Sequence, residues 1–449
     1  MAPSYLIKPI LDYDYASITH GKGIYLYDEY GRGYIDGSSG AVTASIGHGV
    51  QEIIDVMKKQ SEKISFVYRS QFTNMAAEKL AKKMRDISPG DLNWSFFVNS
   101  GSEATETAMK IALQYWQEKG METKNKIISR RMSYHGITLG ALSMSGHRER
   151  RKRFEGLLDK YPFVSTPYYY QDANGRTVDQ CDDFYAAELE IEINQIGSEH
   201  IAAFIAEPII GAAGGVLTPS DNYFKKIKAV CDRYDILFIA DEVMTGVGRT
   251  GKMFAMEHFG VIPDLMATGK GMSAGYTPIA ATVVSDRVME PILNGSKVIM
   301  SGHTFSANPQ SAATALAVIE YIEKNNLIKK SEENGNYLKE KIKEAAENSE
   351  IIGDVRGKGL FIGVEFVKNK RTKAPFSRTS DVVKRIVQAN FEACLLVYPA
   401  NTGVDDLTSH AVILAPPLTI TKSEIDELVA RFTKSLVKVE HQLEKELTP

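Results

Sequence analysis

The sequence predicts an α/β protein, in which a large domain with a mostly parallel central sheet covered by helices is joined to a smaller α+β domain. From about residue 94, short apolar runs bounded by turn residues alternate with stretches of helical periodicity. This is the pattern of parallel strands buried on both faces. The chain has 449 residues, too many for a single hydrophobic core. We therefore expect residues 61–325 to form the large domain, and residues 1–60 and 326–449 to form the small domain together.

The N-terminal part begins with a predicted hairpin over residues 24–36, where two alternating runs flank a glycine-containing turn. Helical periodicity follows at about 50–63 and 74–86. After about residue 328 the helices become charged, and a strand at 359–366 precedes an amphipathic C-terminal helix. In the large domain we expect strands at 94–98, 126–129, 201–206, 236–240 and 279–284, and helices at about 102–119, 220–233 and 308–324.

Composition and charge argue against several classes of protein. The formal net charge is −3, so nucleic acid is not expected to be the main partner. No apolar run approaches the roughly 20 residues of a membrane span, and the N-terminus shows no signal-peptide or transit-peptide pattern. The three cysteines, Cys181, Cys231 and Cys394, have no CxxC or metal-ligand spacing. We therefore expect free thiols, no metal site and a cytoplasmic location.

A phosphate-binding turn is predicted at residues 100–102. An apolar run leads into Ser100, Gly101 and Ser102, and a helix begins directly afterwards. Glycine lets a backbone approach a ligand closely, and the free N–H groups and positive dipole end at a helix start bind anions. The same pattern also fits plain helix capping by Ser100 or Ser102.

Acidic residues follow two of the predicted strands, at Glu207 and Asp241. Ligands bind at the carboxyl ends of strands in open α/β sheets, and an acid at the end of a buried strand is costly unless it is paired. Asp241 could hold the protonated ring nitrogen of a cofactor. The alternative is a loop aspartate that forms an Asx turn.

Lys270 lies between Gly269 and Gly271, which leave room for a bulky adduct beside the amine. A Schiff-base lysine needs a depressed pKa, which partial burial and a nearby cation provide. The alternative is a solvated loop lysine. Tyr134 and His135 follow another predicted strand, where the tyrosine ring either stacks on a cofactor or belongs to the core.

The order and spacing of these motifs resemble the class III, or omega, aminotransferases, which are fold type I enzymes that depend on pyridoxal 5′-phosphate. The resemblance runs from about Gly23 to Leu418. The stretch from Asp241 to Lys270 is highly specific, because aspartate, glycine-rich turn, Pro263-Asp264 and lysine come in the family's order. The motifs are Ser100-Gly101-Ser102-Glu103-Ala104, Tyr134-His135-Gly136, Glu207-Pro208, Asp241-Glu242-Val243, Gly248-Arg249-Thr250-Gly251, Lys270-Gly271 and His303-Thr304-Phe305.

The resemblance implies a role for each candidate residue. Lys270 would carry the cofactor as a Schiff base and move the proton between the donor Cα and the cofactor C4′ atom, and Asp241 would pair with the pyridine nitrogen. Thr304 would complete the phosphate site of a partner subunit, so we expect a homodimer or a dimer of dimers with shared active sites. Val243 and Tyr134 would pack on the two faces of the cofactor ring, and Gly101 and Ser102 would hold the phosphate, with Ser100 in the same turn. Glu207 would lie near the phenolic oxygen of the cofactor or near a substrate-gating cation. His135 would support the residues that contact the cofactor.

The reaction favoured by the resemblance is a ping-pong amino transfer, although the same fold type also carries racemases, epimerases, aminomutases and decarboxylases. Ornithine- and 4-aminobutyrate-type members commonly have a carboxylate-binding arginine where Ile137 stands. Many omega-amino-acid members place one shortly before a Pro-Pro-Leu, but no arginine closely precedes Pro416 here. We therefore expect an amine or omega-amino acid as donor and pyruvate or another small 2-oxo acid as acceptor.

Other side chains remain candidates for substrate binding. Tyr68 and Tyr398 either line an aromatic pocket or pack in the core. The arginines left to bind an acceptor carboxylate are Arg69 and the loop residues Arg371 and Arg378. Arg356 either fills that role or is structural.

Overall fold

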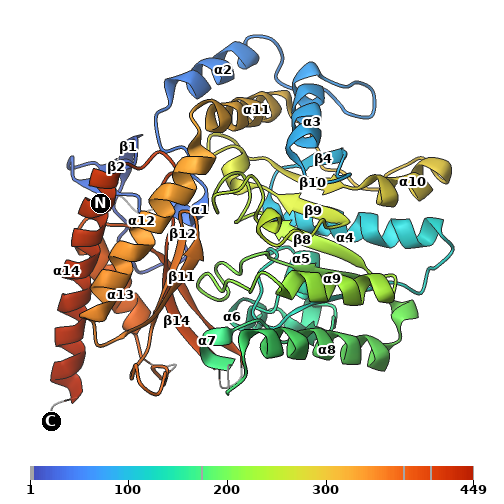
Figure 1. Cartoon of the computed structure of the whole chain (residues 1–449). Helices are drawn as coiled ribbons and strands as arrows, with labels where there is room; N and C mark the ends of the chain where they lie inside the picture. The colour runs from blue at the N-terminus through green and yellow to red at the C-terminus, as the bar shows by residue number, and fades with distance from the viewer. Residues whose placement is uncertain (1–4, 173–174, 378–379, 405–406, 448–449) are drawn as a thin grey trace.

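The computed structural model describes residues 5–172, 175–377, 380–404 and 407–447, which form three sheets and the helices around them (Figure 1). The largest sheet has seven strands in the order β4-β10-β9-β8-β7-β5-β6. Neighbouring strands from β9 to β6 are parallel, whereas β10 runs antiparallel to both β4 and β9. The strands are β4 (Trp94–Val98), β5 (Lys126–Arg130), β6 (Phe163–Val164), β7 (Ile201–Ala206), β8 (Leu237–Glu242), β9 (Leu265–Thr268) and β10 (Ala280–Val284).

Helices cover both faces of this sheet, which explains why its strands read as continuous apolar runs. Along β8, Leu237 and Ile239 pack in the cluster that contains α4 and α10, whereas Phe238 and Ala240 pack in the cluster that contains α8 and α9. Successive residues of a strand point to opposite faces, so one strand contributes to two cores. The helices are α4 (Gly101–Glu118), α8 (Val178–Ile196), α9 (Tyr223–Arg233) and α10 (Asp286–Asn294).

A second sheet is antiparallel throughout, in the order β11-β12-β14-β13, and lies on the left in Figure 1 with α12, α13 and α14. Its strand at 361–366 was expected, whereas the other three were not. The elements are β11 (Ile352–Lys358), β12 (Phe361–Phe366), β13 (Tyr398–Val404), β14 (Leu407–Leu414), α12 (Leu327–Glu347), α13 (Val382–Glu392) and α14 (Lys422–Leu447).

The N-terminal hairpin forms a small sheet that joins the C-terminal part of the chain. Ile35 donates its backbone N–H to Cys394 O (2.9 Å) and accepts one from Leu396 (2.9 Å). The helices α2 and α3 pack against α11. The bounds are β1 (Ile18–Lys22), β2 (Tyr25–Asp28), β3 (Gly33–Ile35), α1 (Ser39–Val42), α2 (Gln51–Ser61), α3 (Met75–Ile87) and α11 (Pro309–Lys324).

The remaining elements are short and lie in the connections between strands of the large sheet. Among the helices of the described ranges, none has the length and apolar character that a membrane span requires. The short helices are α5 (Leu139–Met144), α6 (Arg148–Arg151), α7 (Tyr169–Asp172) and the 3₁₀ turns η1 (Glu155–Leu157), η2 (Ser198–His200), η3 (Ala255–His258) and η4 (Lys270–Met272).

Candidate active site

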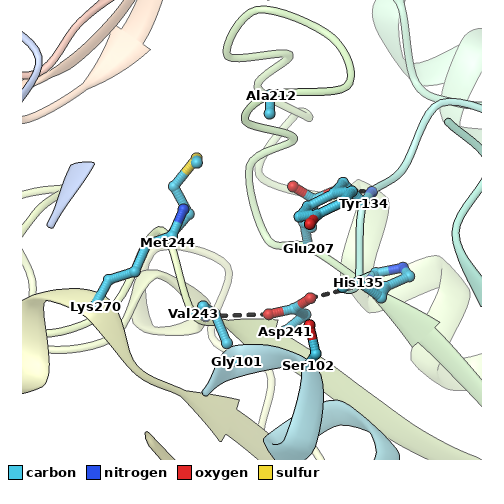
Figure 2. Close-up of a pocket in the computed structure, with 11 residues that line it drawn as sticks. Gly101, Ser102, Tyr134, His135, Glu207, Ala212, Asp241, Val243, Met244 and Lys270 are labelled. Atoms are coloured by element: carbon cyan, nitrogen blue, oxygen red, sulfur yellow. Dashed lines mark hydrogen bonds and ion pairs between the residues drawn. The ribbon is translucent and has the colours of Figure 1, made fainter. Parts of the chain in front are cut away.

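A cavity of about 160 Å³ opens where the strands β7, β8 and β9 end (Figure 2). Figure 2 shows Lys270 on one side of the cavity and Tyr134, Glu207 and His135 on the other. This is the carboxyl edge of the parallel strands, where open α/β sheets bind ligands. Eight of the predicted site residues line the cavity, namely Gly101, Ser102, Tyr134, His135, Glu207, Asp241, Val243 and Lys270. Gly136, Ala212 and Met244 complete its wall.

Asp241 is fixed at the end of β8 by two hydrogen bonds. Its Oδ2 lies 2.8 Å from His135 Nδ1, and its Oδ1 accepts from the backbone N–H of Val243 at 3.1 Å. His135 is itself held by its backbone, which donates to Ser145 Oγ and accepts from Thr105 Oγ1. With Asp241 ionised, the short contact requires a proton on His135 Nδ1. The carboxylate is thus buried, oriented and available to a cationic N–H donor in the cavity.

Glu207 fixes the side of the cavity that Tyr134 forms. Its Oε1 accepts the backbone N–H of Tyr134 (2.9 Å) and its Oε2 accepts that of Gly211 (3.0 Å). Burial raises the pKa of Glu207 above its ordinary value. Arg130, which is also buried, donates from Nη2 to the carbonyl oxygen of Glu207. In this chain the carboxylate of Glu207 therefore holds both Tyr134 and the turn at Gly211 in place.

Lys270 follows β9 with a backbone φ of 43°, in the left-handed region that residues with a side chain rarely occupy. Burial lowers the pKa of its amine to about 8, against the opposing influence of Asp241 and Glu207. A sizeable fraction of the amine is therefore neutral near pH 7–8 and able to attack a carbonyl carbon. Strained backbone of this kind is concentrated at functional sites.

In the turn before α4, one residue caps the helix and the next two line the cavity. Ser100 is the N-cap, since its Oγ accepts from Glu103 N (3.2 Å), and it does not line the cavity. Ser102 lines the cavity, and its Oγ accepts from Ile137 N (3.0 Å). A Cβ at Gly101 would lie 2.7 Å from Val243 Cγ1, so only glycine fits there. The capping interpretation thus holds for Ser100, and the helix start is left open toward the cavity beside Gly101 and Ser102.

Thr304 does not line the cavity of its own chain. It lies exposed in the loop before α11, next to Phe305, whose side chain is 59% exposed. Arg69 donates to the carbonyl oxygen of Ser301 in the same loop and lies over the ring of Phe96 at 5.1 Å. Neither residue can serve the cavity of this chain from these positions.

The other predicted carboxylate-binding arginines are also absent from the cavity wall. Arg356 donates to Gly214 O and Gly215 O (both 2.9 Å) and pairs with Asp354 and Glu365. Its donors are therefore used inside the protein. Arg371 does not line the cavity, and Arg378 lies outside the described residues.

The two candidate tyrosines differ in environment. Tyr68 is 54% exposed in this chain, so core packing does not describe it. Tyr398 is partly buried and packs against the core beneath β7 and β8. Neither is part of the cavity wall.

Sequence reasoning missed one cation close to the site. The Cζ atom of Arg150 lies 4.7 Å from the ring centroid of Tyr134, which lines the cavity. The run Arg148-Glu149-Arg150-Arg151-Lys152-Arg153 resembles an ordinary solvated helix face. Nothing in its local pattern distinguishes the second arginine from its neighbours.

The residues present fit pyridoxal 5′-phosphate. They combine an anion-binding helix start, a buried carboxylate, an amine of lowered pKa, and Val243 and Tyr134 as apolar and aromatic walls in one cavity. The phosphate would meet backbone N–H donors at the helix start, and the cationic ring nitrogen would meet the carboxylate of Asp241.

Comparison with known proteins also indicates an enzyme that uses pyridoxal 5′-phosphate. The profile of the family described as "Aminotransferase class-III" matches residues 11–436. "Uncharacterized aminotransferase YodT" of Bacillus subtilis is 52% identical over 99% of this chain and 100% of that protein. The putrescine–pyruvate aminotransferase of Pseudomonas aeruginosa is 34% identical over 93% of this chain and 90% of that protein. The crystal structure of a PLP-bound amine transaminase from an uncultivated Pseudomonas species superposes with a TM-score of 0.92 at 31% identity, over 98% of this chain and 99% of that one.

Proposed function

Because the chain belongs to the class III aminotransferases, which depend on pyridoxal phosphate, we propose that it transfers an amino group from an amine or omega-amino acid to pyruvate or another small 2-oxo acid by a ping-pong mechanism. The observation that carries the proposal is the buried Lys270 amine, whose pKa is lowered to about 8, in one cavity with the fixed carboxylate of Asp241. The cofactor, when bound, supplies an electron sink for the negative charge that develops at the donor Cα.

The chain's own residues would divide the work as follows. Lys270 would hold the cofactor covalently and, once released by a donor, carry the proton between the donor Cα and the cofactor C4′ atom. Asp241 would keep the ring nitrogen protonated, and its bond to His135 would keep the carboxylate aimed at that nitrogen. The backbone N–H groups near Gly101 and Ser102 would bind the phosphate. Val243 and Tyr134 would confine the ring between them.

The assembly we propose is a homodimer, or a dimer of dimers, in which Thr304 completes the phosphate site of a second subunit. Its support is the exposure of the loop that carries Thr304, where Met300 is 83% exposed and Phe305 59%. Large apolar side chains exposed together commonly mark an interface. A second subunit seated on this loop would cover them.

The acceptor we propose carries a single carboxylate. Ile137 offers no cation, and the guanidinium of Arg356 is already bonded to two carbonyl oxygens and two carboxylates. A buried carboxylate without such a partner forfeits on the order of 2–3 kcal/mol. The second carboxylate of 2-oxoglutarate would therefore lack a clamp, and pyruvate should be preferred.

The test is a panel of amine donors assayed with pyruvate and with 2-oxoglutarate, with loss of the cofactor absorbance band as readout. We expect amino transfer that requires a 2-oxo acid, and a higher kcat/KM for pyruvate. Turnover without any 2-oxo acid would instead indicate an isomerase or decarboxylase. A clear preference for 2-oxoglutarate would contradict the proposed acceptor while leaving the aminotransferase in place.

The compartment we propose is the cytoplasm. All three cysteines are free thiols in the structure, with Cys181 and Cys231 buried. Burial raises the pKa of the Cys231 thiol well above its ordinary value, so that thiol is unreactive. Unpaired cysteines are typical of a reducing environment.

A further inference from the structure

The short helix α6 places a cation beside the cavity. Arg150 lies over the ring of Tyr134 at 4.7 Å, and His147, the residue before α6, meets the same ring edge-on at a centroid distance of 6.4 Å. Tyr134 is itself part of the cavity wall. The guanidinium of Arg150 is therefore one aromatic ring away from the cavity.

This guanidinium differs from that of its neighbour on the same helix. Arg151 donates to the carbonyl oxygens of Leu142, Ser143 and Ser145, and so holds α5 and α6 together. Within the described parts of the chain, Arg150 forms no ion pair and no side-chain hydrogen bond, and its side chain is exposed. A guanidinium has five N–H donors, and here they are available to a ligand.

The charge of Arg150 also reaches the reactive amine. It acts on Lys270 in the same direction as burial and lowers the pKa of that amine, whereas Asp241 and Glu207 raise it. Lys270 is the one cationic side chain among the described residues of the cavity wall, and it is committed to the cofactor in the proposed function. A carboxylate that enters beside Glu207 and Asp241 needs another positive charge.

We propose that Arg150 binds the carboxylate of the 2-oxo acid acceptor, and of the amino acid formed from it, at the edge of the cavity next to Tyr134. This inference rests on the proposed function. A guanidinium is suited to the task because it grips a carboxylate through two parallel N–H donors. The contact with the Tyr134 ring positions the guanidinium without using any of its N–H donors. One such group serves one carboxylate, as in pyruvate.

The proposal separates the partners of the reaction by their chemistry. Pyruvate and alanine carry the carboxylate that Arg150 would hold. An amine donor or an aldehyde acceptor carries none, and its binding should not depend on this residue. The effect of removing the guanidinium should therefore follow the carboxylate of the substrate and not the rate of the chemical step.

The experiment compares Arg150→Ala and Arg150→Lys with the wild-type holoenzyme, and uses Arg148→Ala as the matched control on the same exposed helix. KM and kcat are measured with pyruvate and with butanal as acceptors and one common amine donor. For Arg150→Ala we expect KM for pyruvate to rise about 10- to 100-fold, the effect of losing a charge-assisted pair, while KM for butanal stays within about 2-fold. Arg150→Lys should recover part of the loss because it restores the charge, and Arg148→Ala should match the wild type.

A binding measurement keeps this test separate from that of the proposed function. Propionate, which has the carboxylate but no reactive carbonyl, is titrated calorimetrically into each holoenzyme, and Arg150→Ala should weaken its binding about 10-fold or more. Equal losses with pyruvate and butanal, or no loss with either, would overturn the role of Arg150. If the wild type transfers amino groups to neither acceptor, the proposed function fails, and the propionate titration alone decides whether Arg150 binds carboxylates.

Discussion

Replacing Lys270 by methionine should make the cofactor-free protein more stable, because the lysine amine is placed where its charged form is unfavourable. Burial lowers its pKa from 10.5 to about 8. Methionine has a similar length, is unbranched and carries no charge. The left-handed φ of 43° at this position is the same for both residues, so backbone strain cancels in the comparison.

The magnitude follows from the linkage between protonation and folding. At pH 7 the amine is mostly charged in both states, and the folded protein bears nearly the whole cost of the lowered pKa, ~3 kcal/mol. Between about pH 8 and 10.5 the unfolded chain binds the proton and the folded protein does not, so folding becomes more favourable as pH rises. At pH 9.5 about 1.5 kcal/mol of the cost should remain.

The assay is urea unfolding of cofactor-free wild type and Lys270→Met at pH 7 and pH 9.5, at one protein concentration. We expect the variant to be more stable by ~3 kcal/mol at the lower pH and by about half of that at the higher pH. Lys297→Met is the control, because Lys297 also has a left-handed φ (60°) but is exposed. It should stay within about 0.5 kcal/mol of the wild type at both pH values. A variant no more stable than the wild type, or a gain independent of pH, would refute the reasoning.

Three further predictions concern the cofactor. Borohydride treatment of the purified yellow protein should fix the cofactor to one peptide containing Lys270, and mapping by mass spectrometry to another lysine would end the central assignment. Asp241→Ala should keep the fold, seen by circular dichroism, but lower kcat at least ~100-fold, because the ring nitrogen loses its anionic partner; half-reaction rates near those of the wild type would remove Asp241 from the mechanism. Thr304→Ala should weaken cofactor retention in dialysis without changing the dimer seen by light scattering, and a fully active monomer would be incompatible with a shared site.

Much of the fold could be predicted because its strands are buried on both faces. The runs at 94–98, 201–206 and 279–284 became β4, β7 and β10 within a residue or two. The antiparallel direction of β10 was not predicted, since periodicity gives no strand direction. The four-residue β9 was missed because a run that short carries little pattern. The proposed division at residues 60 and 325 stays a prediction.

The position of a candidate residue in the cavity was predictable where its neighbours in sequence reveal it, whereas the chemical roles stay predictions. Lys270 between two glycines and Asp241 at a strand end are such cases, and both line the cavity. Ser100 shows the limit, because a cap and a phosphate ligand have the same local sequence and only the helix geometry separates them. Arg150 could not be found, because its proximity to Tyr134 depends on the tertiary packing of α6, which local sequence does not reveal.

The bonds of Arg356 tie the shape of the cavity to the second sheet. Arg356 belongs to β11, and its hydrogen bonds to Gly214 and Gly215 hold the loop that carries Ala212 into the cavity wall. Glu365, on the neighbouring strand β12, anchors the guanidinium from behind. This part of the cavity wall is therefore held by contacts that also join the two sheets. Substitutions that enlarge the cavity there, for bulkier substrates, should also lower the folding stability. On α6 the two functions are separated, because Arg151 bonds the carbonyl oxygens that hold the helix in place while the exposed Arg150 has no such bonds among the described residues. If Arg150 binds the substrate carboxylate as proposed, substitutions there should change substrate preference with little effect on folding stability.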